Sequence, residues 1–161
     1  MRLAAVIALL VALVAPAPLP AEGALRMLET SEETRGWEAV GRLELGGRGF
    51  CTGALIAPDL VLTAAHCLYD KDTGARIDVT EIEFLAGWRN GRAEAYRQVR
   101  RAVAHPNYRF QTETSASRVR DDVALLELHH PIRNTSVIPF RTGEHPGPGA
   151  RIGVVSYARE R

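Results

Sequence analysis

The sequence predicts an all-β fold, and three observations support this prediction. From Trp37 onward, short runs of β-forming residues alternate with Gly, Pro, Asn and Asp turn signals. These runs are short and evenly spaced, which is typical of sandwiches and small barrels. Beyond the first residues, no long segment has the apolar period of an amphipathic helix. Periodicity alone leaves the choice between a sandwich and a barrel open.

Turn signals bound each expected strand in turn. Gly46–Gly49 separates the first two strands as a hairpin loop, and Pro58-Asp59 makes a tight turn before the third. Further loops are expected at Asp70–Gly74, Trp88–Gly91, Thr112–Arg120 and Pro146–Gly149. The expected strands are Glu38–Leu45, Gly49–Ile56, Leu60–Thr63, Glu81–Ala86, Tyr96–Ala104, Val123–Leu128 and Ile152–Tyr157.

Residues 1–21 have the layout of a secretory signal peptide. Arg2 supplies the positive charge, Leu3–Val14 is an unbroken apolar run, and a Pro/Ala-rich stretch follows. The run is shorter than the roughly 20 residues of a membrane-spanning helix, so an uncleaved membrane anchor is the less favoured alternative. Residues 22–36 are polar and acidic and predict a flexible leader or pro-segment, with the folded domain at 37–161. The expected location is therefore secreted or periplasmic.

The charge balance gives no reason to expect a nucleic-acid partner. The chain of 161 residues has a net charge of +1, with 46% apolar and 24% charged residues, as in ordinary globular proteins. No general attraction to nucleic acid or acidic lipid follows, and we expect no membrane association after signal cleavage. The basic run Arg97, Arg100 and Arg101 is interpreted as a solvated strand face.

Cys51 and Cys67 are the two cysteines of the chain. In an exported protein such a pair most simply forms one disulfide. Closing the loop between the two cysteines would stabilise the fold by about 3 kcal/mol. Two separate buried thiols are the alternative. A zinc site is not favoured, because no second Cys or His pair stands at ligand spacing.

The most informative segment runs from Phe50 to Cys67. A strand with Cys51 leads through a turn into a second apolar strand, which ends in Thr63-Ala64-Ala65-His66-Cys67. A histidine that moves protons needs fixed placement within hydrogen-bond reach of its partner. A bridge between the two cysteines would tie the backbone beside His66 to the neighbouring strand.

This segment resembles the trypsin-like serine proteases. Thr63–Cys67 is similar to their histidine motif, and Cys51–Ile56 is similar to the strand that bridges to it. The resemblance covers about residues 37–157 and implies a double β-barrel, of which this chain supplies the first barrel and the start of the second. It also implies a serine endopeptidase that acts on polypeptides, with His66 as general base. It implies no metal and no organic cofactor.

The segment Asp121-Asp122-Val123-Ala124-Leu125-Leu126-Glu127-Leu128 resembles the aspartate motif of the same family. By that match Asp122 is the triad aspartate, which would hold the His66 imidazole in the required tautomer. Asp121 stands next to it and should face the other way, because successive residues of an extended segment point to opposite faces. His105 is interpreted as a structural or surface residue, and His129, His130 and His145 as solvated residues.

The family's nucleophilic serine lies in a Gly-rich turn, and no segment of this sequence matches one. Ser31, Ser115, Ser117, Ser136 and Ser156 all lack flanking glycines that could form an oxyanion hole. We therefore expect the chain to be the N-terminal portion of the enzyme and to be inactive alone. A non-catalytic homologue that acts as a binding module is the alternative.

The Ile-Val-Gly-Gly sequence that usually follows the activating cleavage is also missing. Cleavage after Arg35 would expose Gly36-Trp37-Glu38 instead. This departure and the single cysteine pair favour the bacterial trypsin-like or glutamyl-endopeptidase-like branches. The resemblance also implies that the pocket that sets substrate preference lies in the second barrel, beyond the part that this chain supplies.

Overall fold

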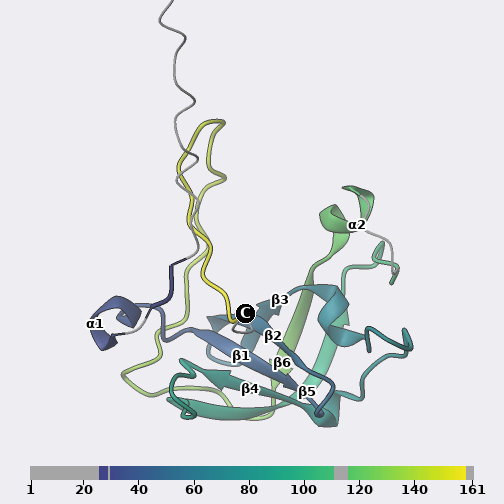
Figure 1. Cartoon of the computed structure of the whole chain (residues 1–161), viewed down its shortest axis with the longest axis horizontal. Coiled ribbons are helices and arrows are strands. Elements are labelled where there is room, and N and C mark those ends of the chain that lie inside the picture. The colour runs from purple at the N-terminus through teal and green to yellow at the C-terminus, as the bar shows by residue number, and fades with distance from the viewer. Residues whose placement is uncertain (1–25, 29, 111–115, 159–161) are drawn as a thin grey trace, which may run out of the picture.

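Six strands form one closed barrel in the order β1-β2-β3-β6-β5-β4, and β4 pairs back onto β1 (Figure 1). This computed structural model describes residues 26–28, 30–110 and 116–158, with side chains from residue 119 onward after the second gap. All neighbouring strands run antiparallel. The all-β prediction is confirmed, and the fold is a barrel rather than a sandwich.

The first six predicted strands are confirmed, with ends that differ by at most two residues. They are β1 (Val40–Leu45), β2 (Phe50–Ala57), β3 (Leu60–Thr63), β4 (Ile82–Ala86), β5 (Ala95–Ala104) and β6 (Ala124–Leu128). The short helical elements are α1 (Ser31–Thr34), the 3-10 turns η1 (Ala65–Leu68) and η2 (Val79–Glu81), and α2 (Ala116–Asp121).

Every strand contributes at least one fully buried side chain to the centre of the barrel. Inward and outward positions alternate along the strands, so the apolar residues of one face meet inside. Each such side chain stabilises the fold by roughly 1.5–3 kcal/mol on burial. These residues are Leu43, Leu55, Val61, Phe84, Val99 and Leu126, all with 0% exposure.

The turn between β1 and β2 explains the paired glycines. Gly46 and Gly47 have φ angles of +61° and +76°. A two-residue hairpin turn needs positive φ at both central positions, and glycine adopts it without steric cost. The Arg48 N–H donates to the Leu45 carbonyl across this turn, as the predicted hairpin requires.

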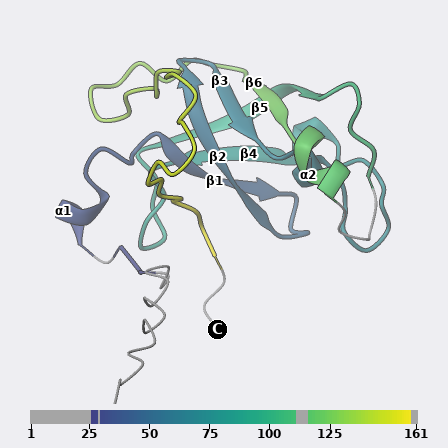
Figure 2. The same ribbon diagram turned by 90° about the horizontal axis from the view of Figure 1, so that it is seen from above.

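The predicted strand Ile152–Tyr157 is wrong. This segment has no regular secondary structure, and Ile152 and Val154 are 76% and 84% exposed. Apolar alternation alone does not make a strand, because a strand also needs a neighbour in register for its backbone hydrogen bonds. The segment, coloured yellow in Figure 2, meets the barrel at Tyr157, whose backbone N–H donates to the Thr52 hydroxyl in β2 and whose hydroxyl lies 3.4 Å from the Val40 carbonyl in β1.

The predicted loop Thr112–Arg120 is also partly wrong, since residues 116–121 form helix α2. Residues 112–115 lie outside the described part of the chain. The sequence here is polar, and a six-residue helix has no apolar stripe to reveal it. In Figure 1, α2 stands at the end of the barrel where β6 begins.

Part of the predicted leader is ordered. Thr30 and Glu33 form a reciprocal capping box at the start of α1. Arg89 in the β4–β5 loop donates to the Ser31 hydroxyl at 2.9 Å, which ties α1 to the barrel. The division into leader and domain stays a prediction. The predicted signal peptide lies outside the described residues, among which no helix is long and apolar enough to cross a membrane.

Gly41 in β1 gives a direct test of the barrel packing. A Cβ there would lie 2.2 Å from a ring carbon of the fully buried Phe84, so Gly41→Ala should lower the free energy of unfolding by about 3 kcal/mol. Urea denaturation measures the change. Gly143→Ala is the matched control, because a Cβ at Gly143 meets no atom within 4 Å. Equal stability of the two variants would contradict the described packing.

Candidate active site

His66 lies in η1, the 3-10 turn that follows β3 directly. Its neighbours Ala65 and Leu68 are 0% and 1% exposed and anchor the turn in the core. The His66 side chain itself is 44% exposed. The small residues before His66 therefore allow a tight change of direction that leaves the imidazole at the surface of a rigid element.

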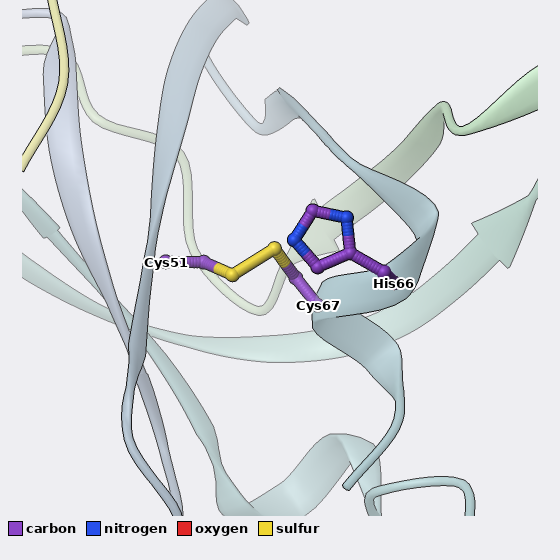
Figure 3. A group of neighbouring side chains, drawn as sticks. All are labelled: Cys51, His66 and Cys67. Atoms are coloured by element: carbon purple, nitrogen blue, oxygen red, sulfur yellow. A yellow bond between two sulfur atoms is a disulfide. The ribbon is translucent and has the colours of Figure 1, made fainter. Parts of the chain in front are cut away.

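A disulfide joins Cys51 in β2 to Cys67 in η1, with the two Cα atoms 6.1 Å apart. The predicted bridge is confirmed, and the alternative of two separate thiols is wrong. Figure 3 shows the bridge beside the His66 ring. The two sulfurs and a His66 ring nitrogen lie within 4.8 Å of one another, but sulfurs bonded to each other are not available as thiolate metal ligands.

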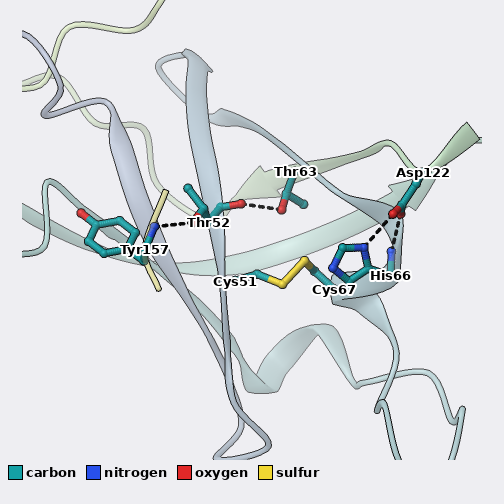
Figure 4. The surroundings of a disulfide bond; sticks show 7 residues. All are labelled: Cys51, Thr52, Thr63, His66, Cys67, Asp122 and Tyr157. Atoms are coloured by element: carbon teal, nitrogen blue, oxygen red, sulfur yellow. Dashed lines mark hydrogen bonds and ion pairs between the residues drawn. A yellow bond between two sulfur atoms is a disulfide. The ribbon is translucent and has the colours of Figure 1, made fainter. Parts of the chain in front are cut away.

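Asp122 contacts His66 at two points (Figure 4). Its Oδ2 lies 2.7 Å from the imidazole Nδ1, and its Oδ1 accepts the His66 backbone N–H at 2.8 Å. A carboxylate only accepts hydrogen bonds, so the Nδ1 atom carries the proton and Nε2 of the neutral ring has a free lone pair. The Asp122 side chain is only 15% exposed, which protects this contact from water.

The pairing of β3 with β6 brings these two residues together. Thr63 at the end of β3 pairs with Ala124 at the start of β6. Because the strands are antiparallel, the residues that follow β3 and precede β6 meet at the same end of the barrel. His66 and Asp122 are separated by 56 residues in sequence and adjoin for this reason.

The remaining histidines have other surroundings. Asp121 points away from His66 and lies beside His105, with its Oδ1 3.6 Å from the imidazole Nδ1, a contact that the sequence analysis did not anticipate. His129, His130 and His145 are exposed, in agreement with their interpretation as solvated residues.

No described serine bonds to His66. Ser31 accepts a hydrogen bond from Arg89, and Ser136 and Ser156 are exposed. The side chains of Ser115 and Ser117 lie outside the described residues. Within the described chain, the recorded hydrogen bonds of the His66 ring therefore come from Asp122.

Sequence reasoning missed a chain of polar contacts that runs from Thr63, at the end of β3, to Tyr157. The Thr63 hydroxyl, in a residue only 7% exposed, donates to the Thr52 carbonyl at 2.8 Å. The Thr52 hydroxyl in turn accepts the Tyr157 backbone N–H at 2.8 Å (Figure 4). The polar residues Thr52 and Thr63 within two otherwise apolar strands were the available signal, but the link to Tyr157 depends on the three-dimensional path of the chain.

An aromatic cluster holds the Tyr157 side chain. The Arg42 guanidinium lies 4.2 Å from the Phe50 ring centroid and 4.7 Å from that of Trp88, within cation–π range. Tyr157 packs edge-on against Trp88 and donates its hydroxyl to the Trp88 carbonyl at 2.8 Å. Burial raises the pKa of the Tyr157 hydroxyl to about 12, while the Arg42 charge acts in the opposite direction.

Comparison with known proteins identifies the family. The family model described as Trypsin matches residues 28–160. The chain belongs to the trypsin family. Mast cell protease 3 of Ovis aries is 31% identical over 156 residues, which make up 94% of this chain and 57% of the relative. Cathepsin G of Homo sapiens is 34% identical over 120 residues, 70% of this chain and 41% of the relative.

Serine protease 56 of Mus musculus is 35% identical over 96 residues, 60% of this chain and 14% of the relative. This member of the trypsin family thus spans between 14% and 57% of the length of these three relatives. All three are animal proteases, so they give no support to the narrower bacterial or glutamyl-endopeptidase-like branch.

The disulfide should account for a large share of the stability. The Cys51→Ala/Cys67→Ala variant removes the cross-link between residues separated by 16 positions, so its unfolded chain has more conformational entropy. The free energy of unfolding should fall by about 3 kcal/mol. Urea denaturation of the variant and of the wild type, with and without reductant, measures this. Reductant should destabilise only the wild type. A variant as stable as the oxidised wild type would contradict the prediction.

Tyr157 should make stability fall at high pH. Its pKa in the folded protein, about 12, exceeds the ordinary tyrosine value of 10.0 because the side chain is buried, so the folded state holds the phenolic proton more tightly. This contribution is fully present below pH 10 and is lost as the pH rises toward about 12. Tyr157→Phe should flatten that decline in urea denaturation, whereas Tyr96→Phe, at a 46% exposed position, should keep it. Identical slopes in the wild type and Tyr157→Phe would refute the assignment.

Proposed function

We propose that this chain is part of a secreted serine endopeptidase in which His66 is the general base and Asp122 is its orienting partner. The observation that supports this proposal most strongly is the 2.7 Å contact between His66 Nδ1 and Asp122 Oδ2. The His66 ring that makes this contact is half exposed. Membership of the trypsin family supports the hydrolysis of peptide bonds in polypeptide substrates.

The proposed chemistry follows from the two contacts of Asp122. The carboxylate holds the Nδ1 proton, so Nε2 of the half-exposed ring can accept the proton of a serine hydroxyl as that oxygen attacks a peptide carbonyl. The imidazolium that results is stabilised by the carboxylate and then protonates the leaving amine. The backbone bond from His66 to Asp122 Oδ1 keeps the carboxylate in place during the transfer.

The nucleophilic serine and oxyanion hole are proposed to lie outside the described residues. This chain aligns with 57% of sheep mast cell protease 3, so a large part of that relative has no counterpart here. The described serines are bonded elsewhere or exposed. On this proposal the described barrel alone supplies base and orienter but no nucleophile, and it is inactive by itself.

Secretion is part of the proposal. The layout of residues 1–21 is that of a signal peptide, and disulfides such as Cys51–Cys67 persist in oxidising compartments outside the cytosol. The narrower bacterial or glutamyl-endopeptidase-like branch rests on the missing Ile-Val-Gly-Gly sequence and the single disulfide alone.

A non-catalytic binding module is the second candidate, and one observation favours it. Leu62, Leu125 and Val103 follow one another across β3, β6 and β5 on the outside of the barrel. They are 39%, 38% and 54% exposed, an apolar row that a partner could cover.

The test is expression of the complete open reading frame that contains this chain, followed by labelling with a fluorophosphonate probe for activated serines. The wild type should be labelled, and His66→Ala should abolish labelling because the serine loses its base. Asp122→Asn should lower kcat about 10⁴-fold through the wrong tautomer. Asp72→Asn is the matched control, since that side chain is 75% exposed and bonds to Lys71.

Two outcomes would decide against the endopeptidase. A folded product that takes up no label would favour the binding module. Labelling that persists unchanged in His66→Ala would mean that another residue activates the serine.

A further inference from the structure

His105 is bonded to the residue that follows Asp122. It comes directly after β5, whose last residue Ala104 pairs with Ala124 at the start of β6. The His105 backbone N–H donates to the Val123 carbonyl at 2.8 Å. The Val123 carbonyl, one residue beyond Asp122, is therefore fixed to the end of β5.

The His105 side chain contacts the residue before Asp122. Its Nδ1 lies 3.6 Å from Asp121 Oδ1, and the Asp121 side chain is 19% exposed. Two other groups face this contact: Arg120 Nε lies 3.9 Å from the same carboxylate oxygen, and the Asn107 N–H lies 3.4 Å from the same ring nitrogen. His105 thus contacts Asp122 neighbours on both sides.

The loop that begins with His105 also supports the other half of the site. Tyr108, 5% exposed, donates its backbone N–H to the His105 carbonyl. The Tyr108 and Phe110 rings lie 5.9 Å and 5.2 Å from the ring of Tyr69, the residue that caps η1. One short loop therefore touches both the turn that carries His66 and the segment that carries Asp122.

We infer that His105 is a positioning residue for Asp122, acting through Asp121. The Asp122 carboxylate contacts the ring and the backbone N–H of His66 at the same time, so the main chain of Asp122 must not rotate. Contacts to Asp121 and Val123 restrict that rotation from both ends. That this positioning serves catalysis rests on the proposed function, whereas the positioning itself is a property of the described barrel.

The experiment is proton NMR of the chain with ¹⁵N-labelled histidine, following the His66 Nδ1 proton that is bonded to Asp122. Its resonance is identified by its loss in His66→Gln. His105→Ala should speed exchange of this proton with water about three- to fivefold, the range expected when a partly exposed side-chain contact is lost. His145→Ala, which removes an exposed histidine, should leave the exchange rate unchanged.

Two further variants separate positioning from general loosening. His105→Asn removes the imidazole ring, as His105→Ala does, but places an amide nitrogen near the position of Nδ1. It should therefore restore slow exchange of the His66 Nδ1 proton. Asp121→Asn should speed exchange as His105→Ala does, and the double variant should show no additional effect, because both act through one contact. Asp121→Asn keeps the side-chain size and gives the comparison even where His105→Ala does not fold.

An exchange rate that is unchanged in both His105→Ala and Asp121→Asn would overturn the inference. Additive effects of the two changes would show that His105 does not act through Asp121 and would overturn it as well. The measurement needs no serine, so it stands apart from the test of the proposed function. If the exchange rates change as expected but the complete reading frame takes up no fluorophosphonate label, the positioning role of His105 stands and the endopeptidase proposal fails.

Discussion

The antiparallel pairing of β3 with β6 is the constraint on which the site depends. Thr63 opposite Ala124 fixes which residues meet at that end of the barrel, and the turn after β3 then faces the segment before β6. A change of one residue in this register would turn the inward side chains outward, among them the fully buried Val61 and Leu126. The hydrophobic core therefore enforces the register, and through it the contact of His66 with Asp122.

Three further connections hold the same region without belonging to the strand ladder. The disulfide ties η1 to β2, the Asp122 carboxylate ties it to the start of β6, and Tyr69 ties it to the loop after β5. Each connection holds the turn that carries His66 to a different neighbouring element and so restricts its movement in a different direction. A proton-transfer group gains from this rigidity, because small errors in position cost large factors in rate.

The sequence carried enough information for six strands, for the disulfide and for the pairing of His66 with Asp122. The strands follow from apolar alternation between strong turn signals, which are local properties. Ile152–Tyr157 has the same local pattern and fails, because strand formation also depends on a neighbour that local patterns do not reveal. The contact of His105 with Asp121 was equally hidden: a bulge between Val99 and Arg101 shifts the β5–β6 register, and the sequence gives no sign of it.

Closure of the barrel also limits how this chain can associate with others. Because β4 pairs back onto β1, each of the six strands has a neighbour on both sides, and no strand lies at a free edge of the sheet. A foreign extended peptide therefore finds no edge strand to pair with along its length, and edge-to-edge growth of the kind that builds amyloid has no such template in the barrel. Contacts of the barrel wall with another protein are then made mainly through side chains, so their specificity depends on surface composition and not on the shared geometry of the peptide backbone.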